Sequence, residues 1–158
     1  MSLYLIRHGV ADSENARSAP GHYHEPGSLT DKGRDSVLKG ARMLKKKGVK
    51  IDEIWYSTKL RAKQTADIIA DELGVKEVYK KTFLLPNDPI DKCIEKLNGC
   101  EEINLAIVSH LPFLPDLISA LIPSLQEKIN IAWSGIVCLE LKDGKWKISW
   151  MMGAAPAS

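Results

Sequence analysis

The sequence predicts an α/β fold: a three-layer sandwich with a mostly parallel central sheet, helices on both faces and an antiparallel C-terminal strand. Short apolar segments typical of strands alternate along the chain with segments whose apolar residues recur at helical spacing. Two of these segments, 3–6 and 103–108, are strongly apolar, as in strands buried on both faces. Near the C-terminus, two alternating segments flank a turn sequence at 142–145, which indicates an antiparallel hairpin.

The first half of the chain contains clear helix boundaries. Thr30 is a typical N-cap, and apolar residues at helical spacing continue from there to Lys47, where Gly48 marks the end. A second helix closes at Gly74. The segment before Thr30 is rich in Gly, Pro, Asp and Ser and is predicted to be a long loop. The predicted elements of this half are strand 3–6, loop 10–28, helix 30–47, strand 51–56 and helix 60–73.

The second half continues the alternation. Asp88 lies between Pro86 and Pro89, which indicates a constrained turn, and Pro123 ends an apolar helix. The predicted elements here are a short strand within 75–85, helix 90–97, strand 103–108, helix 113–122 and the hairpin strands 135–141 and 146–151.

The composition is that of one ordinary globular domain over residues 1–158, with 44% hydrophobic and 27% charged residues. The net charge of +2 does not indicate nucleic acid or a membrane surface as a partner. No apolar run approaches the roughly 20 residues of a membrane helix, and the start lacks a signal-peptide pattern, so we expect a cytoplasmic protein. Cys93, Cys100 and Cys138 lack C-x-x-C spacing, which indicates reduced thiols and neither a disulfide framework nor a zinc site.

Charged and polar side chains follow three of the predicted strands. Arg7 and His8 follow the first, Ser57 to Arg61 follow the strand at 51–56, and His110 follows the strand at 103–108. In a parallel sheet, ligands bind beyond the carboxyl ends of the strands, so we expect these residues to meet at one edge. Arginines at such an edge need an anionic partner, and Gly9 would let the backbone approach it closely.

Two arginines and two histidines without a metal-ligand set suit a phosphoryl group. Arg presents a planar fork of donors that matches phosphate oxygens, and a neutral imidazole can attack phosphorus. His22-Tyr23-His24 in the long loop contains an H-x-H pair, but no carboxylate or Cys cluster completes a ligand set, so a loop over the site is favoured over a metal site.

These motifs resemble those of the histidine phosphatase superfamily, and within it the compact SixA-like phosphohistidine phosphatases. The matching motifs are L-I-R-H-G at 5–9, S-L-T-D-K-G-R at 28–34, S-T-K-L-R-A-K-Q-T-A at 57–66 and V-S-H at 108–110. The resemblance spans nearly the whole chain. It implies that His8 is the nucleophile and becomes phosphohistidine, that Arg7, Arg61 and His110 hold the phosphoryl oxygens, and that water hydrolyses the intermediate. It also implies a further donor in the backbone N–H of Leu111, no metal and no cofactor.

The chain departs from the mutase-like members of this superfamily. Those members carry Ser three residues after the nucleophile and Asn further on, where this chain has Ala11 and Glu14, with Asn15 one place late. The segment between Leu73 and Ile103 is also too short for the helical insertion of the larger mutases. We therefore expect no mutase activity and a site open enough for a phosphorylated protein side chain.

Asp88 is the candidate general acid, since members that act on esters use a carboxylate to protonate the leaving oxygen. A turn aspartate held between prolines is an equally good interpretation of Asp88. Phosphohistidine already has a good leaving group, so a weak acid at this position favours phosphohistidine as the substrate.

The leading hypothesis is a phosphatase acting on phosphohistidine in a protein. The alternatives are a small-molecule phosphomonoesterase with Asp88 as the acid, and a non-catalytic module that binds phospho-ligands.

Overall fold

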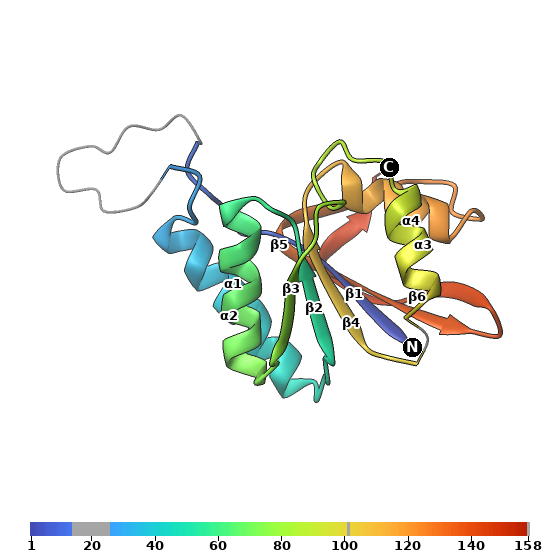
Figure 1. Ribbon diagram of the computed structural model, residues 1–158, viewed down its shortest axis with the longest axis horizontal. Helices are drawn as coiled ribbons and strands as arrows, with labels where there is room; N and C mark the ends of the chain where they lie inside the picture. The colour runs from blue at the N-terminus through green and yellow to red at the C-terminus, as the bar shows by residue number, and fades with distance from the viewer. Residues whose placement is uncertain (14–25, 101, 158) are drawn as a thin grey trace.

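The computed structural model describes residues 1–13, 26–100 and 102–157 (Figure 1). They form one six-stranded sheet and four helices. The elements in chain order are β1 (Ser2–Arg7), α1 (Asp31–Lys46), β2 (Glu53–Tyr56), α2 (Leu60–Leu73), β3 (Glu77–Lys80), α3 (Asp91–Asn98), β4 (Leu105–Ser109), α4 (Phe113–Leu121), β5 (Ile129–Lys142) and β6 (Lys145–Pro156).

The strand order in the sheet is β3-β2-β4-β1-β5-β6. The first four strands in this order are parallel to their neighbours, β5 is antiparallel to β1, and β6 is antiparallel to β5. In Figure 1, α1 and α2 lie on one side of the sheet and α3 and α4 on the other. The predicted α/β sandwich, with a mostly parallel sheet and an antiparallel C-terminal part, is confirmed.

Each face of the sheet has its own apolar core. Side chains of β4 alternate between the two cores: Ala106 and Val108 pack with α1 and α2, and Leu105 and Ile107 pack with α3 and α4. All of β4 is buried, as its continuous apolar sequence predicts. Among the described residues, no helix has both the length and the apolar character needed to cross a membrane.

The predicted helix boundaries agree with the structure within one or two residues. The hydroxyl oxygen of Thr30 accepts a hydrogen bond from the N–H of Gly33 at the start of α1, at 2.9 Å. Gly74 ends α2 in the left-handed conformation, with a φ of 71°. At the ends of the predicted loop 10–28, Ala11 pairs with Leu29 as an isolated bridge. Residues 14–25 of that loop lie outside the described residues.

The C-terminal hairpin is longer than the sequence predicts. The start predicted for β5 at residue 135 and the end predicted for β6 at residue 151 are wrong, because β5 begins at Ile129 and β6 continues to Pro156. The register of the pair shifts between Ile131 and Ile136, and this irregularity hides the alternation in the sequence. The last residues of β6 have weak strand propensity and are held by pairing with the start of β5.

The register of the parallel strands brings their carboxyl ends together. Arg7 at the end of β1 is opposite Ser109 at the end of β4, and Tyr56 at the end of β2 is opposite Val108. The residues that follow these three strands therefore emerge side by side at one edge of the sheet, as predicted.

Candidate active site

His8 follows β1 and is almost fully buried, with 4% of its surface exposed. Its ring Nδ1 lies 2.8 Å from the carbonyl oxygen of Gly9. Because a carbonyl oxygen only accepts, Nδ1 carries the hydrogen, and the neutral ring keeps its lone pair on Nε2. Burial lowers the pKa of His8 to about 4, with smaller contributions from the positive charges of Arg61 and Arg7. The imidazole is therefore neutral near pH 7 and has a nucleophilic nitrogen.

The main chain of His8 is hydrogen-bonded to both neighbouring strands. Its N–H donates to the carbonyl oxygen of Ser109 in β4, at 3.1 Å. Its own carbonyl oxygen accepts from the N–H of Ser134 in β5, also at 3.1 Å. The position of His8 is thus fixed by the centre of the sheet.

Gly9 connects His8 to both helices on one face of the sheet. The N–H of Gly9 donates to Thr65 Oγ1 at 3.1 Å, and the Thr65 hydroxyl donates to the carbonyl oxygen of Arg61 at 2.8 Å. A Cβ atom at Gly9 would lie 2.8 Å from Val37 Cγ2 and 2.9 Å from the carbonyl oxygen of Gly33 in α1. The sequence suggested that Gly9 makes room for an anion, whereas in the structure the absence of its side chain makes room for α1.

His110 lies beside His8, with 4.8 Å between the ring centroids and 59° between the ring planes. It is also buried, with 4% of its surface exposed, and its Nε2 is hydrogen-bonded to Ser57 Oγ at 2.5 Å. Burial is the largest of the effects that lower the pKa of His110 to about 3. The charge that His8 gains when it is protonated and the charge of Arg61 act in the same direction. Both imidazoles are therefore neutral near pH 7.

Arg7 is held from two sides. Its Nη1 donates to the carbonyl oxygen of Ile131 at 2.9 Å, and its Cζ lies 3.7 Å from the ring centroid of Trp133. Its Nε is buried and has no hydrogen-bond partner among the described residues. An unpaired buried donor on a cation is costly, so this atom suits an anionic ligand.

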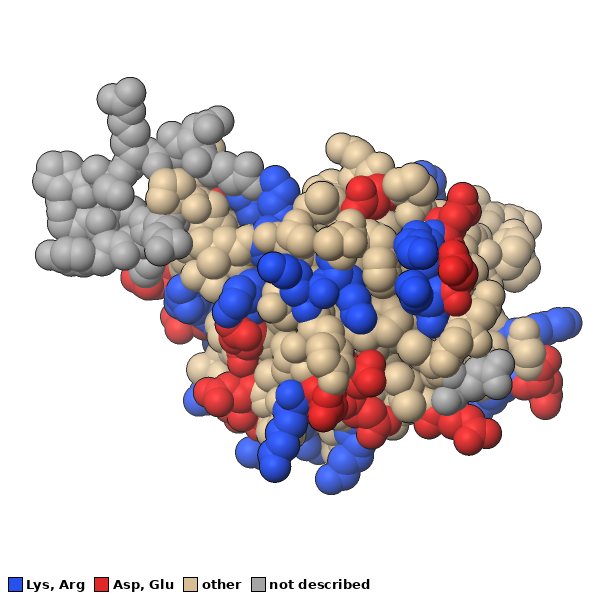
Figure 2. Space-filling view, viewed as in Figure 1, with Lys and Arg blue, Asp and Glu red and all other residues tan. Residues whose placement is uncertain are grey.

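Arg61 lies in the first turn of α2, and its Nη2 donates to the carbonyl oxygen of Asp12 at 3.5 Å. Arg61, Lys59 and Arg7 all act on His110 through their positive charge. Figure 2 shows Lys and Arg side chains gathered near the centre of the view, where the carboxyl ends of the strands lie in Figure 1. The positive charge at this edge favours an anion there.

Two neutral imidazoles and two guanidinium groups thus meet where three strands end, an arrangement that can bind a phosphoryl group and attack its phosphorus. The sequence model of the histidine phosphatase superfamily (branch 1) matches residues 3–84, which contain Arg7, His8 and Arg61. The chain belongs to this superfamily. This membership supports phosphatase activity.

Two proteins with related sequences match different lengths of this histidine phosphatase. An uncharacterized protein of Picosynechococcus sp. is 30% identical over 148 residues, which are 88% of this chain and 84% of that protein. The mitochondrial serine/threonine-protein phosphatase Pgam5 of Drosophila persimilis is 33% identical over 94 residues. The match covers 56% of this chain and only 29% of the Pgam5 chain.

Solved structures support the SixA-like branch of the superfamily. The protein histidine phosphatase SixA complexed with tungstate has a TM-score of 0.84 and 25% identity, and 97% of each chain is covered. A phosphohistidine phosphatase of the SixA type from Agrobacterium tumefaciens has a TM-score of 0.72 and 20% identity, with 98% of each chain covered. The second match shows the same fold.

The turn that carries Asp88 is attached to the candidate site. The Ser109 hydroxyl donates to the carbonyl oxygen of Leu84 at 2.7 Å, in the buried region next to His110. Asp88 Oδ2 accepts a hydrogen bond from the N–H of Leu85 at 2.9 Å, and the N–H of Asp88 donates to the Leu85 carbonyl oxygen. This carboxylate therefore stabilises its own turn, as the turn interpretation of Asp88 predicts.

Leu111, the other residue predicted from the resemblance, lines a cavity of about 610 Å³ together with Arg7 and residues of β5 and β6. The cavity adjoins the candidate site on the side of the C-terminal hairpin.

His22, Tyr23 and His24 lie outside the described residues, as do Glu14 and Asn15. Among the described residues, no group of three or more His, Cys, Asp or Glu side chains is placed to hold a metal ion.

Three further residues contact the predicted site residues. Ser57 was expected at this edge of the sheet but was given no role, whereas Thr65 and Trp133 were not predicted there. Ser57 and Thr65 lie within the matched motif at 57–66, so the motif was a signal for both. Trp133 lies 5.3 Å from His8 between ring centroids, in a segment that carried no motif. The sequence could not have indicated its position.

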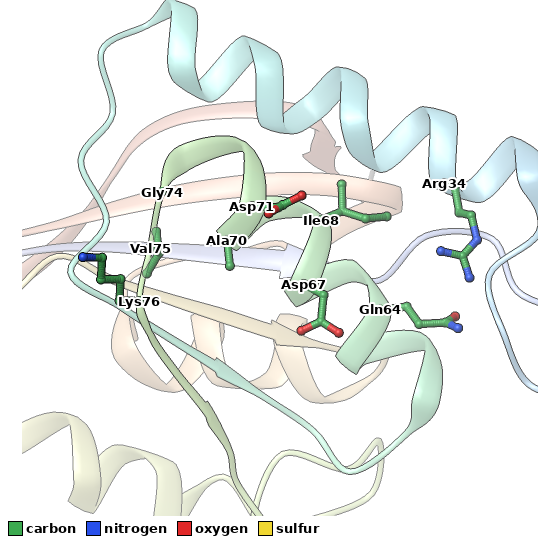
Figure 3. A pocket seen from close by; sticks show the side chains of 9 residues that line it. All are labelled: Arg34, Gln64, Asp67, Ile68, Ala70, Asp71, Gly74, Val75 and Lys76. Carbon is green, nitrogen blue, oxygen red and sulfur yellow. The ribbon is translucent and has the colours of Figure 1, made fainter.

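A second hollow, of about 570 Å³, lies along α2 and is separate from this site (Figure 3). Figure 3 shows Arg34 reaching it from α1, while the remaining side chains come from α2 and the turn after it. None of the residues predicted for the site contributes to this hollow, which is lined by Arg34, Gln64, Asp67, Ile68, Ala70, Asp71, Gly74, Val75 and Lys76.

Proposed function

We propose that this histidine phosphatase removes the phosphoryl group from phosphohistidine in a protein, through a covalent phosphohistidine intermediate on His8. The observation that carries the proposal is the state of the His8 ring. Its Nδ1 hydrogen is donated to Gly9, and its lowered pKa keeps the ring neutral, so Nε2 has a free lone pair beside cationic side chains. A neutral imidazole in this setting is a competent nucleophile.

In the first step, His8 Nε2 forms a bond to phosphorus, and the bond from phosphorus to the substrate imidazole nitrogen breaks. The leaving imidazole takes the bonding electron pair and a proton from solvent. Arg7, Arg61 and His110 hold the oxygens of the transferred group, the backbone N–H of Leu111 adds a donor, and the arginines stabilise the charge that develops. In the second step, the oxygen of a water molecule bonds to phosphorus and the bond to Nε2 breaks. Inorganic phosphate is released and His8 regains its neutral state.

Support for the phosphohistidine substrate comes from the similarity over nearly the full chain to SixA, described as a protein histidine phosphatase. The engagement of Asp88 with its own turn points the same way, because an imidazole leaving group depends little on a general acid.

A second candidate function is a small-molecule or protein phosphomonoesterase that uses the same residues, with Asp88 as the acid. The observation that favours it is the hydrogen bond from Ser109 to Leu84, which fixes the Asp88 turn close to His110. The local similarity to the serine/threonine phosphatase Pgam5 also favours an ester substrate. Loss of ester hydrolysis in Asp88→Asn, with phosphohistidine hydrolysis unchanged, would support this role of Asp88.

The test compares phosphate release by wild type, His8→Ala and His110→Ala on a phosphohistidine protein and on an aryl phosphate ester, with EDTA present. We expect release that prefers phosphohistidine and is lost in His8→Ala. Acid-labile, alkali-stable phosphate trapped on the enzyme should be present in wild type, and it should form more slowly in His110→Ala and be absent in His8→Ala.

The other outcomes separate the alternatives. Preference for the ester would make the enzyme a phosphomonoesterase. Labelling that persists in His8→Ala would refute His8 as the nucleophile. No release from either substrate by wild type would leave a binding module as the remaining interpretation.

A further inference from the structure

Trp133 lies in a part of β5 that departs from regular strand geometry next to the candidate site. The register between β5 and β6 shifts between Ile131 and Ile136. Ser134 has a φ of 62°, in the left-handed region that serine rarely adopts. A bulge of this kind redirects side chains, and bulges occur often beside active sites.

Several contacts hold this bulge in place. The N–H of Ser134 donates to the carbonyl oxygen of His8, so the bulge is attached directly to the proposed nucleophile. A Cβ atom at Gly135 would lie 2.4 Å from the carbonyl oxygen of Gly153 and 2.9 Å from that of Ala132, so only glycine fits there. The buried Oγ of Ser134 has no hydrogen-bond partner among the described residues. A strained residue with an unsatisfied hydroxyl is destabilising, and such features concentrate where the geometry serves function.

The bulge places the Trp133 ring against Arg7. The guanidinium Cζ lies 3.7 Å from the ring centroid, close enough for a cation–π interaction. Although the ring packs against Arg7 and lies near His8, 45% of the Trp133 surface is exposed, which is unusual for so large an apolar residue. Burial of apolar surface therefore does not explain why the ring is at this position.

Together with Ile131, Trp133 leaves Arg7 few alternative conformations. The Ile131 carbonyl oxygen accepts from Nη1, the ring covers one face of the guanidinium, and Nε has no partner among the described residues. The guanidinium is thus fixed with a donor available before any ligand arrives. A donor fixed in advance binds an anion without the entropic cost of ordering a free arginine side chain.

We infer that Trp133 is a positioning residue for Arg7: the bulge in β5 places its ring on the guanidinium and so holds Arg7 ready for a phosphoryl oxygen. The inference rests on the proposed function only in taking the ligand beside His8 to be a phosphoryl group. Trp133 itself takes no part in bond making.

The test measures the dissociation constant of tungstate, a tetrahedral oxyanion, by calorimetry. Trp133→Leu should weaken binding about twofold to thirtyfold, the range expected for loss of one cation–π interaction. Trp133→Phe keeps an aromatic face and should fall between wild type and Trp133→Leu. The matched control is Trp150→Leu. The Trp150 ring makes its own cation–π contact outside the site, with Lys47 Nζ 4.7 Å from the ring centroid, so its loss should leave tungstate binding unchanged.

A double-mutant cycle then shows whether Trp133 acts through Arg7. In an Arg7→Gln background, Trp133→Leu should cause no further loss of tungstate affinity. Additive losses, or unchanged affinity in Trp133→Leu, would overturn the inference. Unchanged affinity with reduced turnover of a phosphoprotein would also overturn it, in favour of direct contact between Trp133 and the protein substrate.

The two proposals fail in distinguishable ways. If wild type binds tungstate but releases no phosphate from phosphohistidine, the proposed function fails, and the cycle still decides the role of Trp133. If wild type does not bind tungstate, Arg7 holds no oxyanion and the inference fails.

Discussion

Thr65 is the residue whose hydroxyl joins α2 to the backbone that orients His8. It has no exposed surface, accepts from Gly9 N–H at 3.1 Å and donates to the Arg61 carbonyl oxygen at 2.8 Å. Thr65→Val keeps the shape of the side chain and removes both interactions. The Gly9 N–H then stays buried without an acceptor, which costs about 1–3 kcal/mol. For a chain of this length, each kcal/mol lowers Tm by about 2–4 °C.

The assay pairs thermal unfolding with steady-state kinetics. Thr65→Val should lower Tm by about 2–12 °C. It should also lower kcat at temperatures where the variant is folded, because Gly9 no longer holds the His8 ring firmly. Thr65→Ser, which keeps the hydroxyl and removes only a methyl group, is the matched control and should keep most of the activity. A Thr65→Val protein as stable and active as wild type would refute the role of this hydrogen bond.

Three further predictions concern the same edge of the sheet. Burial lowers the pKa of His8 to about 4 and that of His110 to about 3, so the NMR signals of these two rings should titrate well below pH 6.5. The unfolding free energy should fall as pH drops from about 6.5 toward 4, because the unfolded chain then binds more protons than the folded one. Titration of both rings near pH 6.5 would contradict this. Ser57→Ala removes the hydrogen bond to His110 and should lower kcat/KM about tenfold, with unchanged kcat/KM as the contrary result. Gly135→Ala should lower Tm and tungstate affinity together, since its Cβ would displace the bulge; a drop in Tm alone would separate the bulge from Arg7.

The residues at the strand ends could be predicted because two simple patterns coincide. The apolar runs of β1, β2 and β4 end at Arg7, Tyr56 and Ser109, and the parallel register places those ends in one row. Knowing where each strand stops was therefore enough to bring His8 and His110 together.

The position of Trp133 could not be predicted for the opposite reason. It depends on a bulge in β5, where Ser134 has a positive φ. Glycine or asparagine usually marks such a position in a sequence, and a serine does not. The glycine that the bulge requires, Gly135, is identifiable only from the carbonyl oxygen of Gly153 on the neighbouring strand. Long-range contacts of this kind are absent from local sequence patterns.

Because β1 pairs with β4 on one side and β5 on the other, it is among the strands least able to unfold locally. The amide hydrogens of His8 and Ser134 are bonded across the centre of the sheet, so their exchange with solvent requires the sheet itself to separate. The outer strands β3 and β6 each pair on one side only and can open locally at lower cost. Partial opening at the rims therefore leaves the His8 backbone in place, and loss of activity on heating should coincide with global unfolding.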